Sequence, residues 1–307
     1  MGAYFSITIS QIAMMFAFIV IGWILRRTRI LPEDTGTVIS KLLVWIFIPA
    51  SVIKSLATNF TVPQLSQKIF ILIAGIIVVT VCFIIAQPLG KLFGTDDYSK
   101  KVYAYSFVVP NTSYVGIPLV LAIFGENVTC DMVVFTIPVM LVMYTWGMYV
   151  LTKQEKISFK SMNNPVIYSI VIGMILGLCG IELPGIVNNV LDNASNCLAP
   201  CAMLLAGFVV GKSSLKTAFG NGRAYIASII RLLVLPAVIA IPMLLLGIDK
   251  EITFIATLVT AMPMGLNSIV FPEAVGQDSS AGASTVVISH IMCIITVPVI
   301  TGILMSI

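Results

Sequence analysis

The sequence contains few charged residues. Of its 307 residues 10% are charged and 59% are hydrophobic, whereas soluble domains usually carry about 25% charged residues. The mean hydropathy of +1.07 agrees with that shortage of charge. The composition therefore excludes an ordinary soluble domain and predicts a polytopic membrane protein.

Several chemical signatures are also missing. There is one histidine, no CxxC pair of cysteines, no Walker motif and no GxSxG motif. The six cysteines lie in or beside apolar runs, so we interpret them as packing residues rather than as disulfides or metal ligands. No Asp or Glu lies deep in a predicted span, so paired acids for hydrolysis are absent. We expect no enzyme, no ATP-driven pump, no metal site and no cofactor.

Apolar runs of about 20 residues, the length that crosses a bilayer, fill the chain. Ten stretches qualify: 6–25, 37–57, 68–89, 103–124, 131–151, 166–182, 187–211, 224–246, 252–272 and 282–304. The polar pieces between them are too short for a soluble domain. We predict an all-α integral membrane protein with ten transmembrane helices.

Basic residues are distributed unevenly among the connections. Connections that follow odd-numbered spans hold twelve: Arg26, Arg27, Arg29, Lys91, Lys100, Lys101, Lys153, Lys156, Lys160, Lys212, Lys216 and Arg223. Connections that follow even-numbered spans hold only Lys68 and Lys250, and the ninth carries Glu273 and Asp278 but no basic residue. By the positive-inside rule the odd connections face the cytoplasm. We expect a multi-pass protein of the cell (plasma or inner) membrane with both termini outside. The net charge of +4 reflects this topology, and we expect no nucleic-acid partner.

The two halves of the sequence resemble each other. IVIGWIL at 19–25 matches IVIGMIL at 170–176 in six of seven residues. Prolines recur at offsets of 151 to 160: Pro49 with Pro200, Pro88 with Pro242, Pro110 with Pro263, Pro118 with Pro272 and Pro138 with Pro298. Five spans is an odd number, so the second half enters the membrane from the other side. We predict a 5+5 inverted-topology repeat, with residues 1–152 and 165–307 as its halves.

Two matched spans contain interruptions that suit a binding site. PNTSYVGIP at 110–118 breaks the fourth span, and PMGLNSIVFP at 263–272 breaks the ninth. Proline lacks an amide hydrogen and opens a helix, and irregular backbone at membrane depth is tolerated only where protein or a water-filled cavity covers it. Crossed broken helices present helix ends to one point, where the positive ends suit a carboxylate. The alternative is a pair of kinked packing helices.

PNTSYVGIP resembles the PNTxxxGIP signature of the auxin efflux carrier family, which includes plant PIN proteins and bacterial organic-acid carriers. NNPVIYSIVIGMILGLCGIELP, LAPCAMLLAGFVVGKS and RLLVLPAVI agree with this family along essentially the full length. The resemblance implies a fold like that of the bile acid–sodium symporters, with spans four and nine crossed. Spans 1, 2, 6 and 7 would be a scaffold that also forms a homodimer, and spans 3–5 and 8–10 would move as an elevator.

The family implies organic-anion substrates, namely auxins in plants and malate- or malonate-like acids in bacteria. Its crossover prolines and asparagine correspond here to Pro110, Asn111 and Pro263. Residues 152–164 replace the long central loop of the plant proteins, so the chain is similar to the short bacterial members. We expect these residues to bind substrate: Pro110, Asn111, Thr112, Ser113, Gly116, Pro263, Asn267, Ser268 and Arg231.

Arg231 and His290 are the titratable residues that lie deep in predicted spans. Arg231 follows Arg223 by eight residues, roughly 12 Å along a helix, and an intramembrane charge indicates function. It would balance a substrate carboxylate or a carbonyl end of a broken helix; the alternative is a fixed tether. His290 is a candidate for proton coupling, and a neutral histidine that donates to a carbonyl is the alternative.

The predicted function is secondary transport of a small organic anion across the lipid bilayer. The coupling ion, H⁺ or Na⁺, stays open, because the crossovers offer carbonyls and hydroxyls but no carboxylate; uniport or proton coupling is favoured over sodium. The alternative function is a membrane sensor for a small ligand or lipid that uses the carrier fold. Such a sensor would need a partner for its output.

Overall fold

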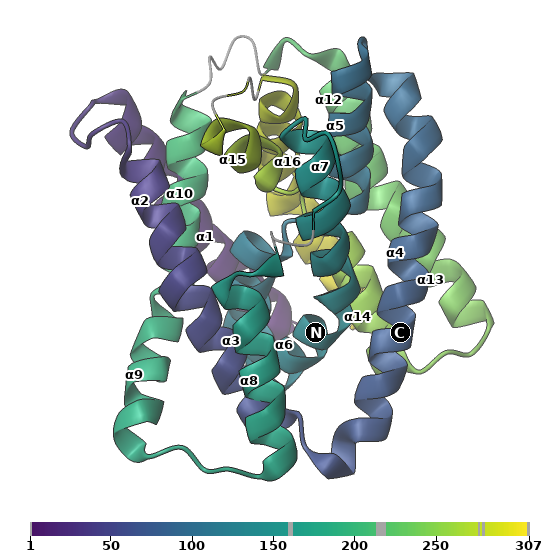
Figure 1. Ribbon diagram of the computed structural model, residues 1–307. Helices are drawn as coiled ribbons and strands as arrows, with labels where there is room; N and C mark the ends of the chain where they lie inside the picture. Colours follow the sequence, from purple (N-terminus) through teal and green to yellow (C-terminus); the bar gives the residue numbers. More distant parts are fainter. Residues whose placement is uncertain (1, 159–161, 213–218, 276, 278–279, 306–307) are drawn as a thin grey trace.

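The computed structural model describes residues 2–158, 162–212, 219–275, 277 and 280–305. Within these residues the regular secondary structure is helical (Figure 1). Lys160, Lys216 and Asp278, which contribute to the charge pattern, lie outside the described residues.

The helices of the first half are α1 (Gly2–Arg27), α2 (Thr35–Leu42), η1 (Leu43–Phe47), α3 (Ile48–Asn59), η2 (Val62–Gln64), α4 (Leu65–Phe93), α5 (Asp97–Val108), η3 (Thr112–Gly116), α6 (Ile117–Val142), η4 (Met143–Gly147) and α7 (Met148–Leu151). Those of the second half are α8 (Pro165–Cys179), α9 (Gly185–Asn196), α10 (Leu198–Lys212), α12 (Gly222–Ile229), η6 (Ile230–Val234), α13 (Leu235–Leu245), α14 (Lys250–Thr260), α15 (Asn267–Ala274) and α16 (Ser280–Leu304).

Six helical segments among the described residues are long and apolar enough to cross a membrane. They are Thr35–Asn59, Val62–Phe93, Thr112–Leu151, Gly185–Gly211, Gly222–Leu245 and Gly282–Leu304. Six is fewer than the ten predicted spans. The first predicted span corresponds to α1, which is not among the six segments, and the other differences have three local reasons. Helix α8 has only 15 residues, the ninth predicted span is divided into α14 and α15, and α6 joins two predicted spans across a kink. Gly125 forms this kink with a φ of 78°, a conformation that favours glycine.

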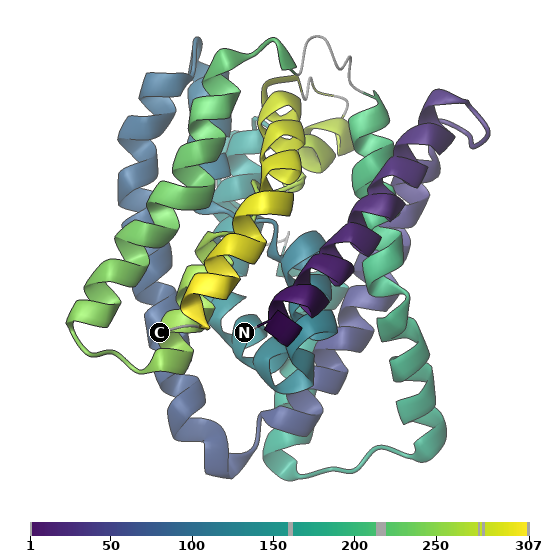
Figure 2. The ribbon, with the colours of Figure 1, turned by 180° about the vertical axis from the view of Figure 1, so that it is seen from behind.

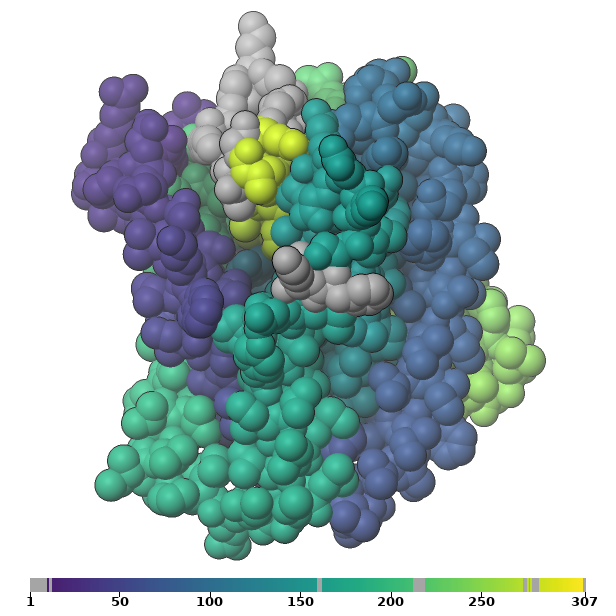
Figure 3. All heavy atoms as spheres, in the orientation of Figure 1, coloured from purple at the N-terminus to yellow at the C-terminus, as the bar shows by residue number. Residues whose placement is uncertain are grey.

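The helices form two groups. Helix α1 packs along α10, and α3 packs against α8 and α9; α4 packs against α5 and α6, α13 against α14, and α12 against α16. Figure 2 shows α1 beside α10, with α4 and α13 on the other side of the molecule and α16 between them. In the space-filling view, the purple N-terminal helices and the blue α4 occupy opposite flanks (Figure 3).

Close backbone approach joins α1 to α10. A Cβ built on Gly207 of α10 would lie 1.9 Å from the carbonyl oxygen of Ile19 in α1. A Cβ built on Gly22 of α1 would likewise lie 2.3 Å from the carbonyl oxygen of Leu204 in α10. Small residues at such a crossing let two membrane helices pack backbone to backbone.

Proline accounts for most of the irregular turns. The π-helical segments η1, η3 and η6 each end two residues before a proline, namely Pro49, Pro118 and Pro236. Because proline cannot donate to the preceding turn, the helix widens locally instead of keeping its regular bonds. These turns therefore mark positions where backbone groups of a membrane helix are released.

Two charged residues lie deeper than the sequence predicts. Lys68, which we expected in an outside connection, lies in α4 and is 2% exposed. Asp131 lies in α6 and is 0% exposed. Each stands at the first position of a predicted span, so this buried ion pair lies at span ends, where Lys68 donates a hydrogen bond to Asp131 and compensates its charge.

Candidate functional site

The two proline-containing breaks lie side by side in the molecule. Residues 109–111, between α5 and η3, run antiparallel to residues 263–265, between α14 and α15, with a β-bridge between Pro110 and Met264. The Asn111 amide donates to the Pro263 oxygen at 2.8 Å, and the Gly265 amide donates to the Val109 oxygen at 3.1 Å. We call this pairing the crossing. It brings together segments that are more than 150 residues apart in sequence.

Asn111 occupies the centre of a buried hydrogen-bond chain. It is 3% exposed, and its Oδ1 accepts from the Tyr114 amide at 3.3 Å, so the side chain caps the start of η3. Its Nδ2 lies 2.8 Å from Nε2 of His290. Proline frees the backbone immediately before this residue, and the asparagine side chain supplies the missing partner at the new helix start.

The partners of His290 fix its tautomer. Nδ1 lies 2.7 Å from the carbonyl oxygen of Val286, and because a carbonyl only accepts, Nδ1 carries the hydrogen. Nε2 therefore accepts from Nδ2 of Asn111. This is a neutral histidine donating to a carbonyl, which was the alternative in the sequence analysis. Protonation would place a second hydrogen at Nε2, and the Asn111 amide would have to turn over to accept it.

The remaining residues of the first break are packed tightly. Thr112 is 4% exposed and its amide donates to the Pro110 oxygen at 2.9 Å, while Ser113 is half-buried. A Cβ on Gly116 would lie 2.2 Å from Cε of Met132. Glycine at this position lets η3 lie against the second part of α6.

The second break contributes Asn267 and Ser268 at the start of α15. Asn267 is 7% exposed, and its Nδ2 lies 2.9 Å from Sδ of Met143. Ser268 donates to the Gly265 oxygen at 2.9 Å. The structure thus places these two residues and Asn111 on either side of the same crossing, as the matched prolines predict.

Arg231 lies apart from these amides and contacts the end of α5. It is 0% exposed, and its Nη1 donates to the Phe107 oxygen at 2.9 Å. Phe107 is in the last turn of α5, where a cation is favourable next to the negative helix end. Of the two charge-balancing roles considered, the structure contains the contact with a broken-helix carbonyl. Among the described residues, Nε and Nη2 of Arg231 have no hydrogen-bond partner.

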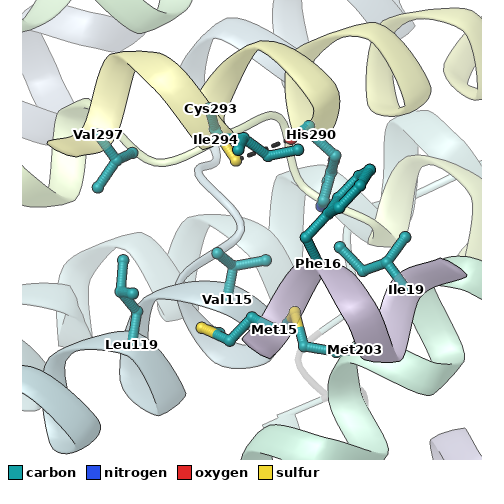
Figure 4. A pocket seen from close by; sticks show the side chains of 10 residues that line it. All are labelled: Met15, Phe16, Ile19, Val115, Leu119, Met203, His290, Cys293, Ile294 and Val297. Atoms are coloured by element: carbon teal, nitrogen blue, oxygen red, sulfur yellow. Dashed lines mark hydrogen bonds between the residues drawn. The ribbon is translucent and has the colours of Figure 1, made fainter. Parts of the chain in front are cut away.

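A small cavity lies beside the crossing, with a volume of about 30 Å³ (Figure 4). Ten residues from α1, η3, α6, α10 and α16 line it: Met15, Phe16, Ile19, Val115, Leu119, Met203, His290, Cys293, Ile294 and Val297. A water molecule needs about 10–15 Å³ of such space, so the cavity is too small for an organic acid. Because His290 lines this cavity and also contacts Asn111, it links the cavity to the crossing.

A larger cavity of about 360 Å³ opens between α1, α2, α10 and α15. Its lining includes the basic residues Arg26 and Lys41 together with Thr37, Ser40 and Val270. Arg26 also pairs with Glu33, at 3.5 Å. This cavity reaches from the α1–α2 connection to α15, the helix that begins at the second break.

The sequence analysis missed a second polar cluster, which consists of Gln67, Lys68, Asp131 and Glu251. Gln67 donates to Oε2 of Glu251 at 2.5 Å, and Lys68 donates to Oδ1 of Asp131. A signal was present: Lys68 and Asp131 are the first residues of two predicted spans, carry opposite charge, and enter from the same side of the membrane. Because the charge pattern assigns Lys68 to a connection, it does not reveal the pair of Lys68 with Asp131.

Comparison with known proteins gives the family. The sequence model described as "Membrane transport protein" matches residues 7–160 and 153–301. The uncharacterized transporter MJ1031 of Methanocaldococcus jannaschii is 23% identical over 298 residues, which cover 92% of this chain and 94% of that protein. The uncharacterized transporter YfdV of Escherichia coli is 19% identical over 308 residues, covering 94% and 95%.

A plant protein matches a shorter region. The probable auxin efflux carrier component 1b of Oryza sativa subsp. japonica is 31% identical over 118 residues, which cover 37% of this chain and 21% of that protein. The family match covers nearly the whole chain, and the apolar helices agree with it. The chain is a multi-pass membrane protein that belongs to the membrane transport protein family, the family of the auxin efflux carriers.

Proposed function

We propose that this protein is a secondary carrier of a small organic anion and that the anion binds at the crossing. The observation that carries the proposal is the antiparallel pairing of residues 109–111 with residues 263–265. Two helical segments, η3 and α15, begin at this pairing, so their positive ends converge there. Such ends stabilise a carboxylate without a fixed counter-ion.

The substrate-binding residues we propose act in two ways. The prolines Pro110 and Pro263, together with Gly116, shape the backbone, while Asn111, Thr112, Ser113, Asn267 and Ser268 supply polar atoms. Arg231 would use Nε and Nη2, which have no partner among the described residues, for the second negative charge of a dicarboxylate. Because Nη1 donates to the end of α5, Arg231 would then connect the bound substrate to that helix.

The larger cavity supports an anionic substrate. Arg26, Glu33 and Lys41 line a space of about 360 Å³ that reaches α15, and because Glu33 pairs with Arg26 these three side chains keep one net positive charge. A positively charged lining attracts anions from solution. Residues 152–164 stand where the plant relatives carry a long central loop, so we favour the malate- and malonate-like acids of the short bacterial members. Auxin appears in the name of the Oryza sativa relative, which matches 37% of the chain.

We propose that the ten predicted spans form a 5+5 inverted repeat like that of the bile acid–sodium symporters, with halves 1–152 and 165–307. The two groups of helices support an elevator, in which α1–α3 and α8–α10 stay fixed and the other helices move. The proposal also includes dimerisation through the fixed group and a cell-membrane location with both termini outside. It includes no enzymatic activity. Proton coupling through His290 would act by turning over the Asn111 amide.

Ligand-dependent thermal stabilisation tests the proposal. Purified protein is screened against monocarboxylates, dicarboxylates and indole acids, with and without sodium, at two pH values. A ligand at 100 times its dissociation constant adds about 2.7 kcal/mol of stability. Asn111→Ala should weaken the stabilising acid about 10- to 100-fold, the effect of removing a hydrogen bond to a charged group.

A matched control makes this test specific. Asn193 is exposed, and its side-chain amide donates to the Asn189 oxygen one turn earlier, so Asn193→Ala should leave ligand binding unchanged. Stabilisation by a neutral lipid or sterol, with no response to any acid, would favour a sensor instead. Equal binding by the wild type and Asn111→Ala would move the site away from the crossing.

A further inference from the structure

The polar cluster of Gln67, Lys68, Asp131 and Glu251 joins three helices that are distant in sequence. Lys68 of α4 donates to Oδ1 of Asp131 in α6. Glu251, in the first turn of α14, accepts from Gln67, the residue before Lys68, at 2.5 Å, and its carboxyl interacts with those of the Lys68–Asp131 pair. All three helices belong to the group that also carries the crossing.

The charges of this cluster do not balance. Lys68 contributes one positive charge, whereas Asp131 and Glu251 contribute two negative charges if both are ionised. Asp131 is 0% exposed and Lys68 is 2% exposed, so an excess charge would lie in a low-dielectric interior. Two carboxylates in contact at such a place do not both stay ionised, because their repulsion favours a shared proton.

One acceptor atom of the cluster lacks a donor, and this indicates where the shared proton lies. Oδ2 of Asp131 is buried and has no hydrogen-bond partner in the described part of the chain, although Oδ1 is bonded to Lys68. A buried acceptor without a donor costs stability. A proton on Glu251 would supply the donor, and Glu251, which is half-buried, is the member of the pair with access to solvent.

The neighbouring titratable groups on α14 are Asp249 and Lys250. Asp249 caps the helix by accepting from the amides of Glu251 and Ile252, and Lys250 is exposed. On α6 the neighbour is Cys130, which is 0% exposed. A metal ion is a poorer occupant, because the Lys68 ammonium already lies on Asp131; and no cluster of three or more metal-ligating residues occurs in the described part of the chain.

We propose that Asp131 and Glu251 bind one proton between them, with Lys68 bonded to Asp131 and Glu251 carrying the hydrogen. The site is separate from the crossing and needs no substrate to form. Since it lies on the helices that would move in an elevator, the proton would travel with them. That coupling role rests on the proposed transport function, whereas the proton site itself does not.

Infrared spectroscopy of the purified protein tests the site directly. A protonated carboxylic acid gives a carbonyl stretching band that is distinct from the carboxylate bands and shifts in deuterium oxide. We expect such a band in the wild type at pH 7, its loss in Glu251→Gln, and its retention in the control Glu182→Gln, because Glu182 is exposed. Asp131→Asn should also remove the band, since Glu251 then becomes the ionised partner of Lys68.

Three results would overturn the proposal. The first is the absence of the band in the wild type at pH 7, which stays decisive even where a variant fails to fold. The second is a band of unchanged intensity in folded Glu251→Gln. The third is replacement of the band by carboxylate signal when sodium replaces choline in the buffer, which would identify a cation as the ligand. Failure of every acid in the thermal screen would refute transport of these anions but would leave the infrared result standing.

Discussion

Removing Lys68 should destabilise the protein strongly. Lys68→Met leaves Asp131 buried at 0% exposure with its bonded cation gone, and breaking one side of a buried ion pair costs about 3–5 kcal/mol. At about 2 °C of melting temperature per kcal/mol for a chain of this size, the expected loss is roughly 6–10 °C. Thermal unfolding in detergent, followed by intrinsic fluorescence, measures it.

The partner variant and the double variant complete the cycle. Asp131→Asn should cost about 1–3 kcal/mol, less than Lys68→Met, because Glu251 lies close enough to Lys68 to replace the lost carboxylate. The double variant removes both charges, so it should melt above Lys68→Met alone. Additive losses in the double variant would refute the reasoning, since they would mean that the two charges do not stabilise each other.

A second lysine provides the control for this cycle. Lys54 pairs with Glu126 at 2.5 Å and with Asp192, but its side chain is 28% exposed. Solvent screens a pair of this kind, so Lys54→Met should cost about 1 kcal/mol or less. If Lys54→Met lowered the free energy of unfolding as much as Lys68→Met, the effect would come from removing a paired lysine and not from burial of the pair.

Three further outcomes are expected. Gly207→Val should lower the melting temperature, because its Cβ would meet the Ile19 oxygen at 1.9 Å and separate α1 from α10, at a cost of about 1–3 kcal/mol. Gly185→Val should not, because no atom of the described residues lies within 4 Å of a Cβ there. Arg231→Gln should weaken binding of acids far more than binding of neutral analogues in the same thermal screen, and equal losses would exclude a carboxylate contact. Hydrogen bonds from Ser99 to Asp96 hold the pKa of that exposed carboxyl at about 2. This folded pKa is below the unfolded one of about 3.9, so the stabilisation is present above pH 4 and disappears as the pH falls towards 2. The melting temperature of Asp96→Ala should therefore fall less steeply over that interval than that of the wild type.

The sequence predicts the helical class and the meeting of the two breaks for a physical reason. A proline removes a backbone donor wherever it stands, so Pro110 and Pro263 identify interruptions without any knowledge of packing. The repeat then relates the interruptions to each other, and the structure pairs them through Asn111 and Gly265.

Charge compensation could not be predicted in the same way. Whether Lys68 lies at the surface or in the interior depends on Asp131, 63 residues later, and on Glu251, 183 residues later. Hydropathy assigns each residue by its own neighbours, so a buried ion pair at the ends of two spans is assigned to connections. The hydrogen bond from Arg231 to the Phe107 oxygen could not be predicted either, because its acceptor is a backbone atom that no side-chain pattern reveals.

The crossing has a consequence for the asparagines that lie beside it. Backbone groups satisfy one another across the two breaks: the amides of Asn111 and Gly265 donate to the oxygens of Pro263 and Val109. Ser289 accepts from the amide of Met264. Proline and main-chain hydrogen bonds therefore hold the path of the backbone, to which the Asn111 side chain adds the cap at the start of η3. Polar side chains that are buried in a membrane protein yet are not needed for the fold are the ones we expect to bind a ligand. Asn111→Ala should accordingly lower the free energy of unfolding of the unliganded protein by only about 1–3 kcal/mol, the cost of a lost cap and of one unpaired His290 nitrogen. Complete unfolding of that variant would show that the asparagine, rather than the paired backbone, holds the crossing together.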